Sequence, residues 1–277
     1  MYAESLSLPE VPRLAIRRCL QMDCGKSPRG DNGFVRVSVD LHCHLLPGLD
    51  DGARDLADAV AMAAQAEADG IAAICATPHI RHDHDVRIAE LPERIAELST
   101  AAGEAGIRTR ILPGGEVAVT ALDGLDDSEL QAVSLGGTGR WVLLEPAPGP
   151  LDDKLDTAVS QLQARRFRAV IAHPERHLAA DLETRLKGLA AEGALVQATA
   201  ASLTDEAAGP GMLTLARAGV IHVLGSDSHS SRAGRPVALT SALEMLSTVE
   251  PTGSHLRWIA RTAPRAIVRG EVLTPPF

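Results

Sequence analysis

Short runs rich in aliphatic and β-branched residues alternate along the chain with longer, alanine-rich amphipathic stretches. This alternation is typical of a parallel sheet whose strands are connected by helices. Seven runs are predicted as strands, at residues 35–41, 71–76, 109–113, 141–144, 168–172, 194–198 and 220–225. Seven stretches are predicted as helices, at residues 53–69, 89–105, 152–165, 181–191, 211–218, 237–247 and 254–267. The pattern therefore predicts an α/β fold of seven strand–helix units.

Residues 1–34 follow neither period and contain several prolines and glycines. Proline and glycine interrupt regular structure, so this segment is predicted as a loose N-terminal extension. The domain itself is expected to span residues 35–277.

Seven units could form an open doubly wound sheet or a closed barrel, and periodicity leaves both open. Imidazole or carboxylate side chains, however, stand at or just after the C-terminal end of six of the seven predicted strands. They are His42, His44, His79, Glu116, Glu145, His173, Asp227 and His229. In a barrel of parallel strands those ends share one face, where active sites are assembled, and Asp51 in the loop after the first strand can join them.

These nine residues have the chemistry of a metal site. His42 and His44, like Asp227 and His229, have the i,i+2 spacing that directs two side chains to the same side of an extended chain. Mixed imidazole and carboxylate ligands suit zinc, manganese or iron. Nine ligands are too many for one ion, so we expect two or three divalent ions, with carboxylates such as Glu116 bridging them.

Successive motifs resemble the PHP superfamily, and within it the bacterial CpsB/CapC type of protein-tyrosine phosphatase of capsule and exopolysaccharide systems. The segments that carry the resemblance are DLHCHLLPGLDDG (40–52), ATPH (76–79), LPGGE (112–116), LLEP (143–146), AHPER (172–176), QATAASLT (197–204) and SDSH (226–229). The resemblance implies a distorted (β/α)7 TIM-like barrel, the PHP fold. It also implies the same nine metal ligands, with manganese favoured.

The resemblance further implies hydrolysis of a phosphomonoester, namely phosphotyrosine on a protein such as a tyrosine kinase, by a metal-activated hydroxide. It assigns Arg176 and Arg235 as phosphate-binding residues, and a planar guanidinium matches phosphate oxygens in a bidentate way. His229 or a metal-bound water is expected to protonate the leaving group. This chain departs from the pattern in the short charged loop after His79 and in Pro146, which follows Glu145.

Three alternatives stay open. Cys75 and Arg81 have the Cys-x5-Arg spacing of cysteine-dependent phosphatases, but Cys75 lies in an apolar run followed by Pro78, whereas such enzymes need a glycine-rich anion-binding loop. Histidinol phosphate is the rival substrate within the superfamily. A metal-binding module without catalytic turnover is the third alternative.

Composition narrows the remaining classes. The formal net charge of −9 argues against a nucleic-acid partner, and no stretch is apolar enough to span a membrane or to act as a secretory signal. A soluble cytoplasmic protein with reduced structural cysteines is expected, and the sequence leaves a homo-oligomeric assembly open. Of the other histidines, His82 and His84 are predicted to lie in an exposed loop, and His222 and His255 to be structural.

Overall fold

The computed structural model describes residues 37–277, so the prediction for residues 1–34 lies outside the described residues. Nine short strands occur in this part of the chain, and every pairing between them is parallel. They are β1 (Val39–Cys43), β2 (Ala73–Ala76), β3 (His79–Ile80), β4 (Arg110–Leu112), β5 (Glu116–Ala118), β6 (Trp141–Glu145), β7 (Arg168–Ile171), β8 (Leu195–Thr199) and β9 (Val223–Gly225).

The two additional strands, β3 and β5, lie just beyond the C-terminal ends of the second and third predicted strands, 71–76 and 109–113, and were not predicted. Thr77 and Pro78 separate β2 from β3, and the segment 113–115 (Pro-Gly-Gly) separates β4 from β5. Proline lacks the backbone N–H that a strand ladder requires, so each run stops and resumes with a changed course. The prediction of seven strand–helix units is confirmed, and β3 and β5 extend the second and third units.

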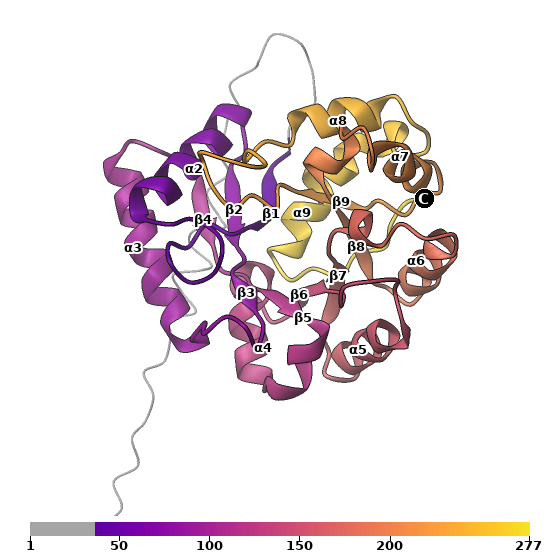
Figure 1. Cartoon of the computed structure of the whole chain (residues 1–277), viewed down its shortest axis with the longest axis horizontal. Helices are drawn as coiled ribbons and strands as arrows, with labels where there is room; N and C mark the ends of the chain where they lie inside the picture. Colours follow the sequence, from indigo (N-terminus) through magenta and orange to yellow (C-terminus); the bar gives the residue numbers. More distant parts are fainter. Residues whose placement is uncertain (1–36) are drawn as a thin grey trace, which may run out of the picture. The chain divides into compact units, whose positions relative to one another are not determined.

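The strands follow one another around a distorted barrel (Figure 1). One sheet has the order β1-β2-β4 and the other β3-β5-β6-β7-β8-β9, and the two are continuous through the broken strands. The first and last strands meet through two backbone hydrogen bonds, from Asp227 N–H to His42 O (2.8 Å) and from His44 N–H to Ser228 O (2.9 Å). The predicted distorted (β/α)7 barrel is therefore confirmed, and its two ends join directly at the motifs HCH and DSH.

Helices surround the strands (Figure 1). Six agree with the predicted ranges: α2 (Leu56–Asp69), α3 (Leu91–Glu104), α5 (Asp153–Ala164), α6 (Leu182–Ala191), α7 (Gly209–Arg217) and α8 (Thr240–Ser247). The last predicted helix is divided into a 3-10 turn (Gly253–His255), a π-helical turn (Trp258–Thr262) and α9 (Ala263–Ile267). The helix α4 (Asp127–Val133) was not predicted, although Asp126 and Glu129 form a capping box at its start. No helix of the described residues is long and apolar enough to cross a membrane.

Side chains along single strands change from apolar to polar toward the C-terminal end. In β6, Trp141, Leu143 and Glu145 share one face because successive side chains of a strand alternate. Trp141 and Leu143 belong to a buried apolar cluster that includes α9, whereas Glu145 carries a carboxylate. In β8, Leu195 of the same cluster is followed two residues later by Gln197. The apolar cluster thus lies under the polar strand ends and supports them.

Candidate metal and phosphate site

His42 and His44 lie at the centre of the polar face, and both are fully buried. Their Nε2 atoms are 3.2 Å apart, and each is close to Glu116 Oε2, at 3.3 Å from His42 and 3.2 Å from His44. Gly225 makes room for this arrangement, since a Cβ atom there would lie 2.6 Å from the Cβ of His42. The two imidazoles therefore face one point, as the i,i+2 spacing predicts.

Glu116 connects most of the predicted ligands. Its Oε2 lies 2.9 Å from His79 Nδ1, because β3 and β5 pair with His79 opposite Glu116. Its Oε1 lies 2.8 Å from His173 Nε2, and His79 Nδ1 is also 3.8 Å from Oε2 of Glu145. The carboxylate thus has ligand-type nitrogens around both oxygens, the position expected of a bridging group.

Four buried atoms of the predicted ligands form no hydrogen bond of acceptable geometry with any residue from 37 to 277: His79 Nδ1, Glu116 Oε2, His173 Nδ1 and Asp227 Oδ1. Of these, His79 Nδ1 lies 2.9 Å from Glu116 Oε2, and Glu116 Oε2 and Asp227 Oδ1 both lie within 3.4 Å of His42 Nε2. Buried polar atoms are nearly always paired, so unpaired atoms that converge on one point call for an explanation. Imidazole and carboxylate groups within 4.8 Å of one another are the donor set of a transition-metal ion. The residues present therefore fit the metal that the motifs imply.

Asp227 and His173 adopt left-handed backbone conformations, with φ of 49° and 34°. Such values are uncommon outside glycine and are retained mainly where surrounding contacts enforce them. For Asp227 the contact is its backbone N–H bond to His42 O, which holds its Oδ1 3.4 Å from His42 Nε2. Backbone strain at these two positions thus coincides with two predicted ligands.

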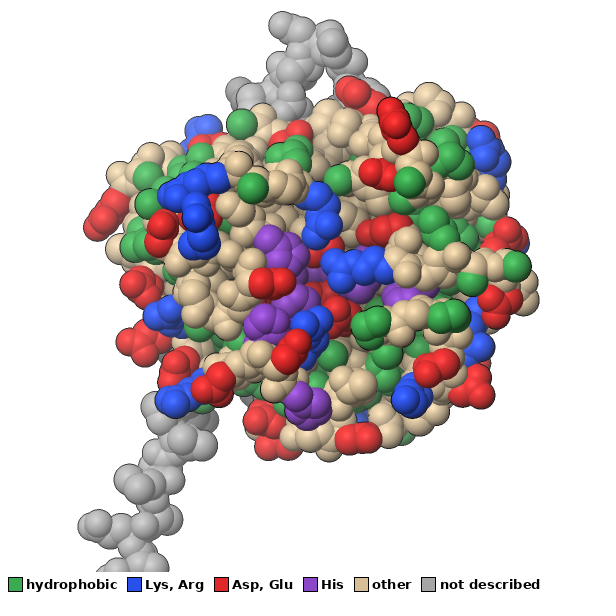
Figure 2. Space-filling model, in the orientation of Figure 1, with side chains coloured by type: hydrophobic (Ala, Val, Ile, Leu, Met, Phe, Trp, Pro, Cys, Tyr) green, Lys and Arg blue, Asp and Glu red, His purple; other side chains and the backbone are tan. Residues whose placement is uncertain are grey.

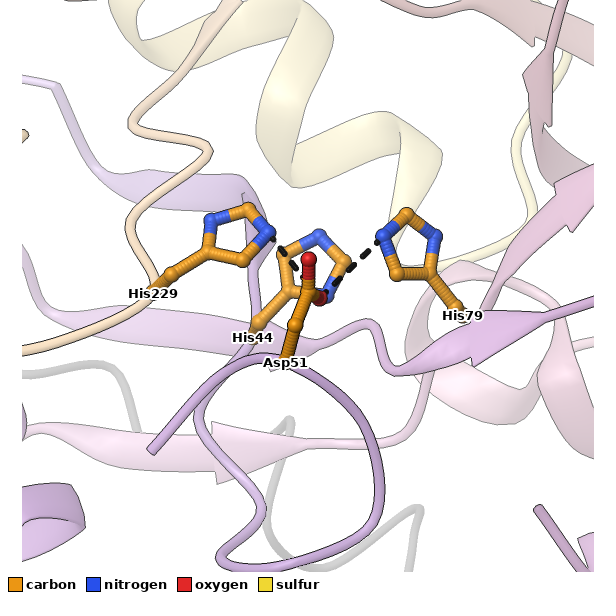
Figure 3. Close-up of side chains that lie close together, drawn as sticks. All are labelled: His44, Asp51, His79 and His229. Atoms are coloured by element: carbon orange, nitrogen blue, oxygen red, sulfur yellow. Dashed lines mark ion pairs between the residues drawn. The ribbon is translucent and has the colours of Figure 1, made fainter. Parts of the chain in front are cut away.

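A second group of candidate ligands lies on the outer side of the cluster and consists of His44, Asp51, His79 and His229 (Figure 3). Asp51 Oδ1 is 3.4 Å from His79 Nε2 and 3.5 Å from His229 Nε2. The ring of His229 stacks on that of His44 with centroids 4.0 Å apart. The other two groups are His42, His44 and Glu116, and His79, Glu116 and Glu145. Seven of the nine predicted ligands thus form three overlapping sets, while His173 and Asp227 lie beside them, near Glu116 and His42.

Burial and charge oppose each other in this cluster. Burial by itself lowers the pKa of His42, but the carboxylates of Glu116 and Asp227 outweigh it and raise the pKa. Burial raises the pKa of Glu116, but His42 and hydrogen bonds from neighbouring histidines lower it well below the usual value. Burial also raises the pKa of Asp227, but the nearby His42 and His44 outweigh it and lower the pKa. The two carboxylates are therefore held ionised, the state a metal ligand requires.

His229 differs from the central histidines. Burial and the positive charge of His44 lower its pKa to about 4. Its Nδ1 lies 3.0 Å from the backbone oxygen of Asp227, which leaves Nε2 directed toward Asp51. A neutral imidazole in this orientation presents a lone pair, which suits a metal ligand better than the proton donor that the sequence also allowed.

Arg176 and Arg235 both reach the site and contact the same oxygen. Arg176 Nη2 lies 3.0 Å and Arg235 Nη2 lies 2.8 Å from Asp227 Oδ2, the oxygen that faces away from His42. Their side chains are 43% and 36% exposed, so both guanidinium groups are open to solvent as well. Figure 2 shows basic, acidic and histidine side chains gathered near the centre of this face. The two predicted phosphate-binding residues are therefore adjacent to the ligand cluster.

Three residues at the site were not predicted. Asp50 binds His44 Nδ1 at 2.8 Å and accepts a hydrogen bond from the backbone N–H of His79. Gln197 Oε1 lies 2.9 Å from His42 Nδ1. Arg81 donates to Glu145 at 3.2 Å. The doubled aspartate at 50 and 51, and a glutamine within an apolar strand, were the available signals for the first two.

The cysteine-dependent alternative is contradicted by the position of its nucleophile. Cys75 is fully buried in β2, and burial raises the pKa of its thiol, the opposite of what a thiolate nucleophile needs. Arg81 is paired with Asp83 and Glu145. No anion-binding loop joins the two residues, because Thr77 and Pro78 continue into β3.

The four other histidines named from the sequence, His82, His84, His222 and His255, differ in their surroundings. His82 is exposed, as predicted, but the ring of His84 is partly buried and stacks on His79 with centroids 5.1 Å apart, so His84 lies nearer the site than an exposed loop implies. His222 is buried and accepts a hydrogen bond from the N–H of Val196, which is a structural role. His255 Nδ1 lies 2.9 Å from Pro251 O, which is also a structural contact.

The amino-acid sequence of this chain is similar to those of known tyrosine-protein phosphatases. The chain is 30% identical over 242 residues to the tyrosine-protein phosphatase YwqE of Bacillus subtilis, covering 85% of this chain and 93% of that protein. It is 26% identical over 200 residues to the putative tyrosine-protein phosphatase CapC of Staphylococcus aureus, covering 69% and 77%.

The fold is also similar to that of solved structures of related proteins. A structure from work on YwqE and the Streptococcus pneumoniae protein CpsB, described as metal-dependent tyrosine phosphatases, superposes with a TM-score of 0.73 at 28% identity. The match covers 85% of this chain and 96% of that one. An organophosphorus hydrolase shares the fold at 14% identity and a TM-score of 0.53. The sequence pattern of CpsB/CapC, capsular polysaccharide synthesis, matches residues 38–267, and the chain therefore belongs to the CpsB/CapC family.

Proposed function

We propose that this chain is a metal-dependent phosphatase that hydrolyses phosphotyrosine on proteins. The observation that carries the proposal is the contact of two arginines with Asp227, whose other carboxylate oxygen belongs to the buried ligand cluster. Phosphate is recognised by arginine and its hydrolysis is promoted by metal ions, so a site that combines both favours phosphoester chemistry. The names of the relatives, tyrosine phosphatases, narrow the phosphoester to phosphotyrosine.

We assign the metal ligands as His42, His44, Asp51, His79, Glu116, Glu145, His173, Asp227 and His229. Three overlapping sets drawn from seven of these residues, two of which contain Glu116, support two or three divalent ions, and we favour manganese. When bound, such ions would lower the pKa of a water molecule toward 7 and neutralise charge on the phosphate.

The side chains themselves bind and orient the substrate. Arg176 and Arg235 present N–H donors beside Asp227 Oδ2, and both can turn to phosphate oxygens because their guanidinium groups are partly exposed. Donors placed in advance around the phosphate stabilise the negative charge that develops in the transition state. Asp50 and Gln197 hold the imidazoles of His44 and His42 from behind, which keeps their Nε2 atoms directed into the site.

We also propose the setting in which the site acts. Residues 35–277 form the catalytic domain, and the substrate is a cytoplasmic phosphoprotein, such as a tyrosine kinase of capsule or exopolysaccharide synthesis. The family's pattern, capsular polysaccharide synthesis, supports this assignment. A homo-oligomeric assembly is compatible with the proposal and is not required by it.

A panel of substrates tests the function. Purified protein reconstituted with Mn²⁺ is expected to hydrolyse a phosphotyrosyl peptide, to lose that activity in chelator, and to turn over histidinol phosphate at least about tenfold less efficiently. Preferred hydrolysis of histidinol phosphate would replace protein phosphotyrosine by the small-molecule substrate. Protein that binds metal and hydrolyses neither compound would indicate a non-catalytic metal-binding module.

A further inference from the structure

Arg81 occupies the site without a role in the chemistry described so far. It is the first residue after β3, two positions beyond the ligand His79, in the charged segment 81–85. Its Nη1 lies 3.2 Å from Oε1 and 3.5 Å from Oε2 of Glu145, a residue 64 positions away in the chain. A side chain from this loop thus reaches into the ligand cluster.

The guanidinium group is held in place from its other side. Asp83 accepts two hydrogen bonds, from Arg81 Nε at 2.9 Å and from Nη2 at 2.7 Å. This two-point contact fixes the plane of the guanidinium and leaves Nη1 as the edge that faces the site. Asp83 alone would satisfy an ordinary surface arginine, so the additional contact with Glu145 needs its own explanation.

Arg81 and Arg176 approach one and the same oxygen. Arg176 Nη1 lies 3.8 Å from Glu145 Oε1, the atom that Arg81 Nη1 approaches at 3.2 Å. Arg81 is 29% exposed, so its guanidinium is open to molecules entering from solvent. Two guanidinium groups therefore converge on one anionic oxygen, and a third, that of Arg235, lies on Asp227. A phosphate oxygen near Glu145 Oε1 would meet the same N–H donors as this carboxylate oxygen does.

We propose that Arg81, braced by Asp83, is a third phosphate-binding residue and acts together with Arg176. This inference rests on the proposed phosphatase function. Arg81 contacts a nonbridging phosphate oxygen of the substrate rather than the peptide around the phosphotyrosine, because the atom it now faces belongs to the buried ligand Glu145 and not to the outer surface. Its contribution is to substrate binding and not to the retention of metal.

The test compares wild type with Arg81→Ala, Arg81→Lys and Asp83→Asn, all loaded with Mn²⁺. Arg81→Ala is expected to raise both the KM for p-nitrophenyl phosphate and the inhibition constant of inorganic phosphate about tenfold, the value of one charge-assisted hydrogen bond. Arg81→Lys and Asp83→Asn should raise both constants about threefold. Lysine lacks the planar guanidinium, and asparagine lacks the charge that holds the Arg81 guanidinium in place. Metal content and kcat should stay near wild type.

Arg87→Ala is the matched control, because the Arg87 side chain lies in the same connection but is 68% exposed and, within residues 37–277, pairs with Glu90 alone. It should leave all constants unchanged. Loss of metal, or a fall in kcat at constant phosphate inhibition, would overturn the proposal by showing that Arg81 positions Glu145. A KM change confined to phosphotyrosyl peptides, or no change at all, would overturn it as well.

Failure of the proposed function is distinguishable from failure of this inference. If the wild-type protein hydrolyses no phosphoester, phosphatase activity is excluded. Binding of inorganic phosphate, measured by calorimetry on metal-loaded wild type and Arg81→Ala, still decides whether Arg81 is a phosphate ligand: tenfold weaker binding supports it and equal binding rejects it.

Discussion

The floor of the site and its rim are built differently. The floor, defined as His42, His44, Glu116 and Asp227, is at most 1% exposed, and each side chain contacts several others of the cluster. The rim, defined as Asp51, Arg176, His229 and Arg235, is 23–60% exposed and makes fewer contacts.

Burial determines what each part can do. The floor contains two ionised carboxylates, each with a buried oxygen that has no hydrogen-bond partner among residues 37–277, so its stability depends on a bound cation. Rim residues keep water as an alternative partner and can exchange it for substrate. Loss of a floor residue should therefore abolish metal binding, whereas loss of Arg176 or Arg235 at the rim should weaken only substrate binding and turnover.

Replacement of Glu116 by Gln tests the floor most severely. Gln keeps the volume but removes the charge that faces His42, His44 and His79. We expect loss of bound metal and a fall in kcat/KM of at least about a thousandfold, measured by elemental analysis and peptide hydrolysis. The control is Glu244→Gln, an exposed glutamate on α8. A variant that keeps its metal and stays within tenfold of wild type would remove the distinction between floor and rim.

Replacement of Arg176 by Ala tests the rim. One donor to the phosphate is lost while the ligand cluster remains, so kcat/KM should fall about a hundredfold with unchanged metal content. Arg232→Ala serves as the control, because the Arg232 side chain is 53% exposed and, among residues 37–277, forms an ion pair with Asp55 alone, at 3.7 Å. Loss of metal from the Arg176 variant would show that this arginine, like the floor residues, is needed for metal binding.

Replacement of Gln197 by Ala tests the support of the floor residue His42. Gln197 is fully buried and contacts His42 Nδ1, so its loss frees that ring to rotate. We expect metal affinity to fall about tenfold to thirtyfold, measured by competition with a chelator. Unchanged affinity would mean that the strand backbone alone orients His42.

His222 is a buried histidine that has no carboxylate partner among residues 37–277. Burial lowers its pKa to about 4, whereas carboxylates raise the pKa of the equally buried His42. Because the unfolded His222 binds a proton near pH 6.5 and the folded one does not, its contribution to stability is complete above pH 6.5 and is lost as the pH falls toward 4.

Between pH 7 and 4.5, His222 should therefore reduce the free energy of unfolding by roughly 2 to 3 kcal/mol. His222→Asn retains an acceptor for Val196 N–H and should make this fall smaller by that amount in urea unfolding of chelator-treated protein. Equal slopes for wild type and variant would contradict the lowered pKa.

Replacement of Cys75 by Ala should have the smallest effect. The thiol lies in the apolar cluster under the site, so its removal should leave kcat/KM within about twofold of wild type and cost about 1 kcal/mol of stability. Peptide hydrolysis and thermal unfolding measure the two effects. Loss of activity in this variant would restore the cysteine-dependent chemistry.

The periodic pattern was sufficient for the order of strands and helices and for the polar strand ends, because alternation and strand termination are local properties. It was insufficient at Pro78 and Pro113, where a proline interrupts one ladder and the strand then pairs with a different part of its neighbour. It also missed α4, whose seven residues are too few for a periodic signal and whose capping box was the available evidence.

The sequence by itself determined which ligands this protein offers, since residue types and their places at strand ends are written in the chain. Only the tertiary structure decided which atoms meet: that Asp50 and not Asp51 orients His44, that Gln197 supports His42, and that Arg81 reaches Glu145. The physical reason is that a contact across 64 or 155 residues depends on strand register, backbone conformation and side-chain rotamer, none of which has a local signature.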